Sequence, residues 1–219
     1  MNLQRTVREH RGFLIFLFSF ALLRTAVADW NPIPSGSMRP TLLEGDVVLV
    51  NRLAYDLKLP LTDLVLLPIA EPQRGDVVTL SSPATGTRLI KRIVGLPGDR
   101  VAMRAGVLLL NGAPAAYRDA QVGGGALRAI ERLDGREHAV QFLPTPRARR
   151  DFAETTVPAG EYFLLGDNRD NSEDSRFIGT VPRARLIGRA HHLLVSADWL
   201  GEDGRRLAPR WGRWGAAIR

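Results

Sequence analysis

Short aliphatic runs separated by turn residues dominate the chain after residue 30, and they constrain its fold more than any other feature. These runs are four to eight residues long, rich in Val, Ile and Leu, and bounded by Gly, Pro, Asp or Asn, which is the pattern of β-strands. The expected strands are Asp46–Asn51, Asp76–Leu80, Thr87–Val94, Arg100–Met103, Val107–Leu110 and Tyr162–Leu165. The sequence therefore predicts a mostly β fold built from antiparallel sheet.

The middle of the chain changes character after a predicted hairpin turn at Asn111-Gly112. Residues 112–158 are weakly periodic and contain three consecutive glycines and the basic cluster Arg147–Arg150. We interpret this part as a small elaboration that is partly loop. The predicted organisation is a main β domain of residues 29–103 and 159–219 with an inserted subdomain of residues 104–158.

The N-terminus carries an apolar segment, Phe13–Leu23, which follows a basic stretch and ends at Arg24. Arg24 can keep its charge at a membrane interface, and Trp30 suits the outer boundary. We therefore predict one transmembrane helix over residues 12–28, with residues 1–11 in the cytoplasm. Ala26-Val27-Ala28 also fits the end of a cleavable secretory signal. Both interpretations place the remaining chain outside the cytoplasm, because basic residues favour an inside N-terminus.

Composition narrows the possible chemistry. Cysteine is absent, which excludes thiol catalysis, cysteine-based zinc sites and disulfides, and four histidines leave little material for a metal centre. We expect no metal and no cofactor. The net charge is +7, but the arginines are scattered among acidic residues, so nucleic-acid binding is not expected. Of the 30 basic residues only Lys58 and Lys91 are lysines, and lysine, unlike arginine, can become neutral when buried.

Two hydroxyl groups lie in the segment directly after the apolar stretch, at Ser35 and Ser37. Prolines and a glycine restrict this loop, and apolar residues frame it. A serine nucleophile needs such fixation and a neighbouring base. The alternative is a Ser/Pro linker between anchor and domain.

Lys91 lies in the predicted strand Thr87–Val94. Alternation places it on one face with Leu89 and Ile93, and burial there would lower the pKa of its ammonium group. A lysine in this state can act as a general base near neutral pH. The alternative is a strand-end lysine that extends to water.

A third segment, residues 166–176, has eleven residues without one hydrophobic side chain. We interpret it as a hydrogen-bonding scaffold in which Asp174 and Arg176 pair and Ser172 orients a neighbouring group. A Ser-His-Asp triad is disfavoured because no histidine has a comparable setting. A serine with a lysine base is the known variant that needs only these parts.

Four motifs in order resemble bacterial signal peptidase I, a family of membrane-anchored Ser-Lys proteases. The resemblance covers about residues 12–200 and supports the anchor over the cleaved signal. The motifs are Pro34–Leu42, Arg74–Val78, Lys91–Asp99 and Gly166–Arg176.

The resemblance implies that Ser37 is the nucleophile and Lys91 the general base. It also implies that the Ser35 hydroxyl joins the Ser37 N–H group in an oxyanion hole and that Ser172 holds the Lys91 amine.

Five further residues receive supporting roles by the same resemblance. Asp174 and Arg176 would form an ion pair, and Ile33, Met38 and Ile90 would line pockets for small side chains at the first and third positions before the cut. Strand alternation turns Ile90 away from the face of Lys91, so its pocket role needs a twist or a bulge.

The expected function is signal-peptide cleavage after Ala-x-Ala-like sites, by a monomer in the inner membrane with its catalytic domain on the outer or periplasmic face. The expected partners are exported preproteins and membrane lipids. Two alternatives stay open: a specialised processing peptidase for a pilin or conjugation substrate, and a non-enzymatic anchored β domain.

Overall fold

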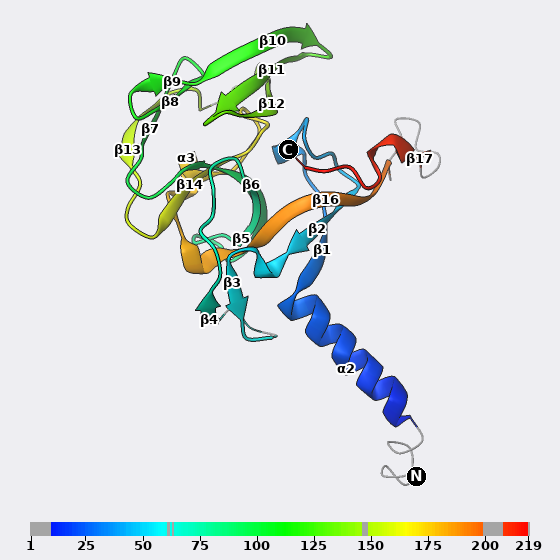
Figure 1. Ribbon diagram of the computed structural model, residues 1–219. Helices are drawn as coiled ribbons and strands as arrows, with labels where there is room; N and C mark the ends of the chain where they lie inside the picture. Colours follow the sequence, from blue (N-terminus) through cyan, green and yellow to red (C-terminus); the bar gives the residue numbers. More distant parts are fainter. Residues whose placement is uncertain (1–9, 61, 63, 146–148, 199–207, 219) are drawn as a thin grey trace.

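A curved antiparallel sheet forms the centre of the computed structural model, which describes residues 10–60, 62, 64–145, 149–198 and 208–218 (Figure 1). Its strand order is β1-β2-β16-β5-β6-β14-β15, and β17 pairs with β16. The strands are β1 Ala28–Pro32, β2 Asp46–Asn51, β5 Val77–Ser81, β6 Arg88–Gly95, β14 Glu161–Leu165, β15 Val181–Pro182, β16 Leu186–Asp198 and β17 Ala208–Pro209. The predicted mostly β antiparallel architecture is confirmed.

Both faces of this sheet are buried. Val77 packs into a cluster with Met38 and Val48, whereas its neighbour Val78 packs into a second cluster with Ile93. Successive strand residues point to opposite faces, so aliphatic side chains in succession supply two clusters at once. This arrangement explains why the strands appear in the sequence as continuous aliphatic runs.

The remaining strands form three smaller sheets. These sheets have the orders β13-β7-β8-β9, β10-β11-β12 and β3-β4. Their strands are β3 Asp56–Lys58, β4 Val65–Pro68, β7 Arg100–Arg104, β8 Val107–Leu110, β9 Ala113–Pro114, β10 Ala116–Gly123, β11 Ala126–Leu133, β12 Arg136–Phe142 and β13 Phe152–Thr156. The boundary predicted at residue 104 runs through the first of them, because β13 pairs with β7.

The turn at Asn111-Gly112 connects β8 to β9, as predicted, and both residues have positive φ (53° and 84°). This conformation suits the two-residue turns that join tight hairpins.

Residues 116–142 differ from the prediction of a partly looped elaboration, because they form the three strands β10, β11 and β12. The reason is that polar side chains occupy inward positions: Glu131, His138 and Gln141 are buried. Hydrophobic alternation is the main sequence signal of a strand, and buried polar residues remove it.

The apolar N-terminal segment forms helix α2, Arg11–Ala26, which projects from the β body (Figure 1). Its aromatic side chains are exposed, with Phe13 and Phe16 both at 61%. The Arg24 guanidinium lies 4.4 Å from the ring centre of Trp30. Among the described residues, no helix has the length and hydropathy needed to cross a bilayer.

The other helical segments are short. They are α3 Ser175–Ile178 and the 3₁₀ turns η1 Gly36–Met38, η2 Arg52–Ala54, η3 Arg183–Arg185 and η4 Trp211–Arg213.

Candidate active site

Ser37 lies in η1, on the loop that leaves β1. Met38 and Leu42 on this loop are fully buried in the cluster beneath the sheet, whereas Ser37 is half-buried and Ser35 is exposed. The apolar side chains therefore hold the loop, and the two hydroxyl groups stay accessible from outside.

Lys91 contacts Ser37 directly. Its Nζ lies 2.9 Å from Ser37 Oγ and donates a second hydrogen bond of 2.9 Å to the carbonyl oxygen of Ile90. β14 pairs with β6 beginning at Arg92, so Lys91 occupies the first position beyond that pairing. We infer that the long side chain reaches the η1 loop around this open part of the strand.

The environment of Lys91 shifts its protonation equilibrium toward the neutral amine. The residue is 2% exposed, and burial lowers its pKa from 10.5 to about 8. Asp174, Asp167 and Glu173 limit the decrease by attracting the charged form. A serine hydroxyl within hydrogen-bond reach of such an amine is the arrangement required for general-base activation.

The residues predicted to surround this pair lie near it. Ser35 Oγ is 3.5 Å from Ser37 Oγ. Ile33 and Met38 are buried in one cluster, and Ile90 packs against it. Ile90 therefore does face away from Leu89 and Ile93, as alternation predicts, and this face is the one that meets the η1 loop.

The polar segment of residues 166–176, which follows β14, also lies at the site. Asp174 and Arg176 form the predicted ion pair through two hydrogen bonds of 2.8 and 2.7 Å. Asp174 also accepts hydrogen bonds from the backbone N–H groups of Gly166 and Arg176. The carboxylate thus holds both ends of the segment.

Ser172 does not make the contact that the resemblance implies. Its Oγ is buried and has no hydrogen-bond partner among the described residues, so the predicted hydrogen bond to the Lys91 amine is not formed in this structure. Gly166 makes room for Ser172, since a Cβ at this position would clash with the Ser172 side chain and lie 2.5 Å from the Ser37 carbonyl oxygen.

Sequence reasoning missed the residue that holds the Ser37 turn. Asn168 donates from its backbone N–H to the Ser37 carbonyl oxygen (3.1 Å) and from its side-chain amide to the Gly36 carbonyl oxygen (2.9 Å). The available signal was the polar run itself, in which Asn168 is 1% exposed. The side-chain NH₂ group of this buried amide is satisfied by a backbone carbonyl of η1, whereas its Oδ1 has no hydrogen-bond partner among the described residues.

A second missed interaction lies beside it. Arg92 donates two hydrogen bonds of 2.8 and 2.7 Å to the Asp167 carboxylate, and Thr41 donates to the same group. Both charged residues are buried. The pair therefore ties β6, at the residue after Lys91, to the η1 loop and the polar segment.

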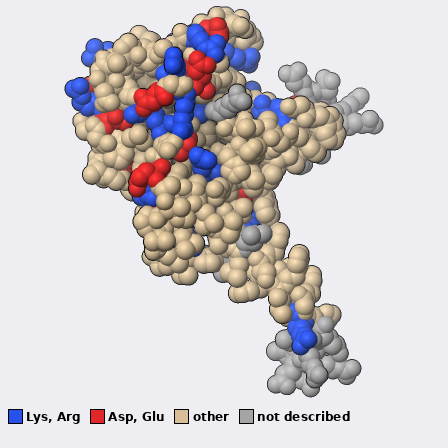
Figure 2. Space-filling view, viewed as in Figure 1, with Lys and Arg blue, Asp and Glu red and all other residues tan. Residues whose placement is uncertain are grey.

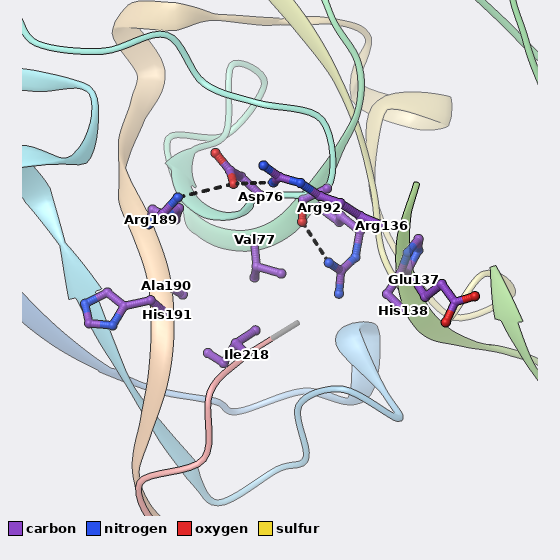
Figure 3. Close-up of a pocket in the computed structure, with 11 residues that line it drawn as sticks. Asp76, Val77, Arg92, Arg136, Glu137, His138, Arg189, Ala190, His191 and Ile218 are labelled. Atoms are coloured by element: carbon purple, nitrogen blue, oxygen red, sulfur yellow. Dashed lines mark hydrogen bonds and ion pairs between the residues drawn. The ribbon is translucent and has the colours of Figure 1, made fainter. Parts of the chain in front are cut away.

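A cavity of about 400 Å³, lined in part by Arg92, lies between the main sheet and β12 (Figure 3). The Asp76 carboxylate in its wall lies between Arg136 and Arg189, with N–O distances of 3.2 and 3.6 Å (Figure 3). Ser37 and Lys91 lie outside this cavity. Within the described part of the chain, no cluster of His, Asp or Glu could hold a metal ion.

Comparison with known proteins identifies related sequences over most of the chain. The family model described as signal peptidase, peptidase S26, matches residues 7–195. A signal peptidase I from Pseudomonas aeruginosa is 37% identical over 206 residues, which cover 87% of this chain and 72% of the relative. A signal peptidase I from Pseudomonas fluorescens is 37% identical over 207 residues with the same coverage.

One solved structure is also similar. A crystal structure of a signal peptidase I from Enterococcus faecalis V583 is 34% identical and covers 55% of this chain and 97% of its own, with a TM-score of 0.37. That score is too low to support a statement about the shape of the fold, so the relationship rests on sequence.

Proposed function

This chain belongs to the peptidase S26 family of signal peptidases, and from this membership we propose that it removes signal peptides from exported preproteins with Ser37 as nucleophile and Lys91 as general base. The observation that carries the proposal is the distance of 2.9 Å between Lys91 Nζ and Ser37 Oγ at a buried lysine.

The proposed reaction proceeds through an acyl-enzyme. Ser37 Oγ attacks the scissile carbonyl carbon while its proton passes to neutral Lys91. The resulting ammonium group then donates the proton to the leaving amine as the C–N bond breaks. In the second half, Lys91 takes a proton from water while the water oxygen bonds to the acyl carbon. The bond between that carbon and Ser37 Oγ then breaks, Lys91 returns the proton to Oγ, and the signal peptide leaves with a free carboxyl group. The pKa of about 8 allows the same nitrogen to accept and return a proton near neutral pH.

Negative charge develops on the carbonyl oxygen when Ser37 attacks. We assign its stabilisation to the Ser37 backbone N–H and the Ser35 hydroxyl, which is exposed beside the nucleophile. Removal of one such donor typically costs about 2.7–4 kcal/mol of transition-state stabilisation. Ser35→Ala should therefore lower kcat while substrate binding is retained.

Substrate selection is assigned to the apolar cluster next to η1. Ile33, Met38 and Ile90 belong to or pack against one cluster next to Ser37, and their aliphatic side chains suit small residues at the first and third positions before the cut. Ala-x-Ala-like ends meet this requirement. A leucine at the first position before the cut should lower kcat/KM strongly, because close-packed side chains cannot move apart at low cost to admit it.

We also propose that residues 12–28 anchor the enzyme in the inner membrane, with residues 1–11 inside and the catalytic domain on the outer or periplasmic face. Exposed aromatic side chains on α2 and the Arg24–Trp30 contact suit this location. The β3–β4 hairpin lies at the end of the body from which α2 projects and exposes Leu64 (61%) and Leu67 (56%) (Figure 1). On the face shown in Figure 2, charged side chains gather away from this end, as expected for a surface next to lipid.

The test of the proposed reaction is cleavage of a preprotein by the full-length chain in detergent or vesicles. Ser37→Ala should abolish release of the mature protein, whereas Ser81→Ala, at the last residue of β5, should cleave at the wild-type rate. A Ser37→Ala variant that retains the wild-type rate would refute the assignment.

A further inference from the structure

The inserted sheet β10-β11-β12 pairs with the polar segment that holds Ser37. The N–H of Gln141, on β12, donates to the Asp167 carbonyl oxygen, and the N–H of Arg169 donates to the Gln141 carbonyl oxygen, both at 2.9 Å. Gln141 and Asn168 form a parallel β-bridge. Backbone hydrogen bonds from one residue of β12 thus hold both neighbours of Asn168.

A buried ion pair reinforces this contact. Arg169 donates to both carboxylate oxygens of Glu131, on β11, and the two residues are 1% and 0% exposed. Tyr117, on β10, also donates to Glu131. Burial by itself would raise the pKa of Glu131, but Arg169, together with His138, outweighs it and holds this pKa well below the ordinary value. Both groups are therefore charged at neutral pH.

Stability alone does not explain why this buried ion pair is present. Two charges lose their hydration on burial, and their attraction often does no more than offset this cost. A bidentate guanidinium–carboxylate pair does, however, define the relative position of its two backbones closely. Here these backbones are β11 and the residue after Asn168.

Asn168 connects the backbone held by this ion pair to the loop that carries Ser37. Its backbone N–H and its side-chain amide bind the Ser37 and Gly36 carbonyl oxygens, 3.1 and 2.9 Å away. Ser37 Oγ must lie within hydrogen-bond reach of Lys91, which belongs to the main sheet and not to the inserted sheet. A displacement of about 1 Å at a reacting group can lower a rate about a hundredfold.

We propose that Glu131 is a positioning residue for Ser37: through Arg169 and Asn168, the inserted sheet sets the distance between the nucleophile and Lys91. This role rests on the proposed function, because it concerns the Ser37–Lys91 pair. The inserted sheet is then part of the catalytic apparatus although Glu131 touches neither Ser37 nor Lys91.

A second contact of the inserted sheet with the main sheet provides a matched control. Arg136, on β12, donates to the Arg74 carbonyl oxygen and to Asp76, each at 3.2 Å. Figure 3 shows Arg136 beside Asp76. Its side chain is half-exposed. This contact also joins the two sheets, but it does not involve Asn168 or η1.

The experiment compares Glu131→Gln with Arg136→Gln in the full-length chain, using preprotein cleavage and acylation of Ser37 by a small electrophilic probe. We expect Glu131→Gln to lower kcat and the acylation rate together by about 10- to 100-fold, with KM close to the wild-type value. Arg136→Gln should leave all three quantities near wild type.

The double variant Glu131→Leu/Arg169→Met separates position from stability. It removes both buried charges, so the melting temperature should return toward or above the wild-type value, while kcat and acylation stay low. This variant also serves if Glu131→Gln fails to fold. Recovery of kcat together with the melting temperature would overturn the proposal, as would a wild-type acylation rate in folded Glu131→Gln.

Different results would refute the proposed function and the positioning role of Glu131. Cleavage by Ser37→Ala at the wild-type rate would refute the proposed function itself. If Ser37→Ala is inactive while both Glu131 variants cleave normally, the function stands and the positioning role is wrong.

Discussion

The two lysines of this protein are equally buried, yet they lie in regions that use them differently. Lys91, on β6, and Lys58, on β3, are each 2% exposed. Lys91 Nζ lies 2.9 Å from the hydroxyl of Ser37. Lys58 Nζ donates to the carbonyl oxygen of Leu186, on β16.

The difference shows that burial alone does not make a lysine a base. A carbonyl oxygen only accepts, so it offers no proton to a neutral amine, whereas a hydroxyl group can give its proton up. We infer that Lys58 joins the β3–β4 hairpin to β16 and that Lys91 activates Ser37.

The largest effect is expected from Lys91→Met. Loss of the general base should lower kcat by about 10²–10⁴-fold, which is the usual contribution of general acid–base catalysis. Lys58→Met should leave kcat near the wild-type value once folded protein is compared with folded protein. Preprotein cleavage under saturating substrate measures both, and an equal loss in the two variants would show that the comparison is wrong.

Lys91→Arg separates charge from basicity. Arginine keeps the positive charge but cannot become neutral in a protein, so this variant should be as inactive as Lys91→Met. Lys58→Arg keeps a charged donor for the Leu186 carbonyl and should remain active. Full activity of Lys91→Arg in the same cleavage assay would exclude a neutral-lysine mechanism.

The pH dependence should follow Lys91. Only the neutral amine accepts the Ser37 proton, and burial lowers the pKa of Lys91 to about 8. Accordingly, kcat/KM should rise about tenfold per pH unit below that value and level off above it. Lys58→Met should show the same midpoint. A flat profile between pH 6 and 9 would contradict the assignment.

Ser172→Ala tests the buried hydroxyl group that distinguishes the surroundings of Lys91. The Ser172 hydroxyl is buried without a partner among the described residues, so its removal should not lower the free energy of unfolding. If this hydroxyl binds the ammonium group formed during the reaction, kcat should fall about 10- to 100-fold, because hydrogen bonds to charged groups contribute about 1.5–3 kcal/mol. Unchanged kcat would remove Ser172 from the mechanism.

The smallest effect concerns stability. Substitution of the two lysines should change the free energy of unfolding in opposite directions. The pKa of Lys91 is lowered on folding from 10.5 to about 8, so at pH 7 its burial in the charged form costs up to about 3 kcal/mol. Lys91→Met should therefore raise the free energy of unfolding at pH 7. Between pH 8 and 10.5 the unfolded state of the wild type binds more protons, so wild-type stability rises with pH and this difference shrinks.

Lys58→Met should act in the opposite direction. It removes the group that donates a hydrogen bond to the buried Leu186 carbonyl oxygen. Leaving such an acceptor without a partner typically lowers the free energy of unfolding by about 1–3 kcal/mol. Denaturant unfolding at pH 7 and pH 10 measures both variants. A loss of stability in Lys91→Met would show that the burial of this lysine carries no cost.

Much of the fold and part of the candidate site followed from local pattern. Strand β2 was predicted with its observed bounds, and β5, β6 and β14 within one residue at each end, because aliphatic runs between turn residues are a local signal. Ser37 and Lys91 also followed from local signals: Ser37 lies in a loop that prolines and a glycine restrict, and Lys91 shares its strand face with apolar residues. The strands β10–β12 were not predicted as such, because Glu131, His138 and Gln141 occupy inward positions and hide the alternation.

The amino-acid sequence by itself therefore determined six of the strands, β2, β5, β6, β7, β8 and β14, together with the two short motifs that carry the hydroxyl and the amine, and the family of the chain. Only the tertiary structure decided that Lys91 meets Ser37 while Lys58 meets a carbonyl group, that Asn168 holds the η1 turn, and that Glu131 reaches this turn through Arg169. The physical reason is distance along the chain. Periodicity and turn chemistry act over a few residues, whereas hydrogen bonds between buried polar groups join segments separated by tens of residues, and their partners are set only when the sheets pack.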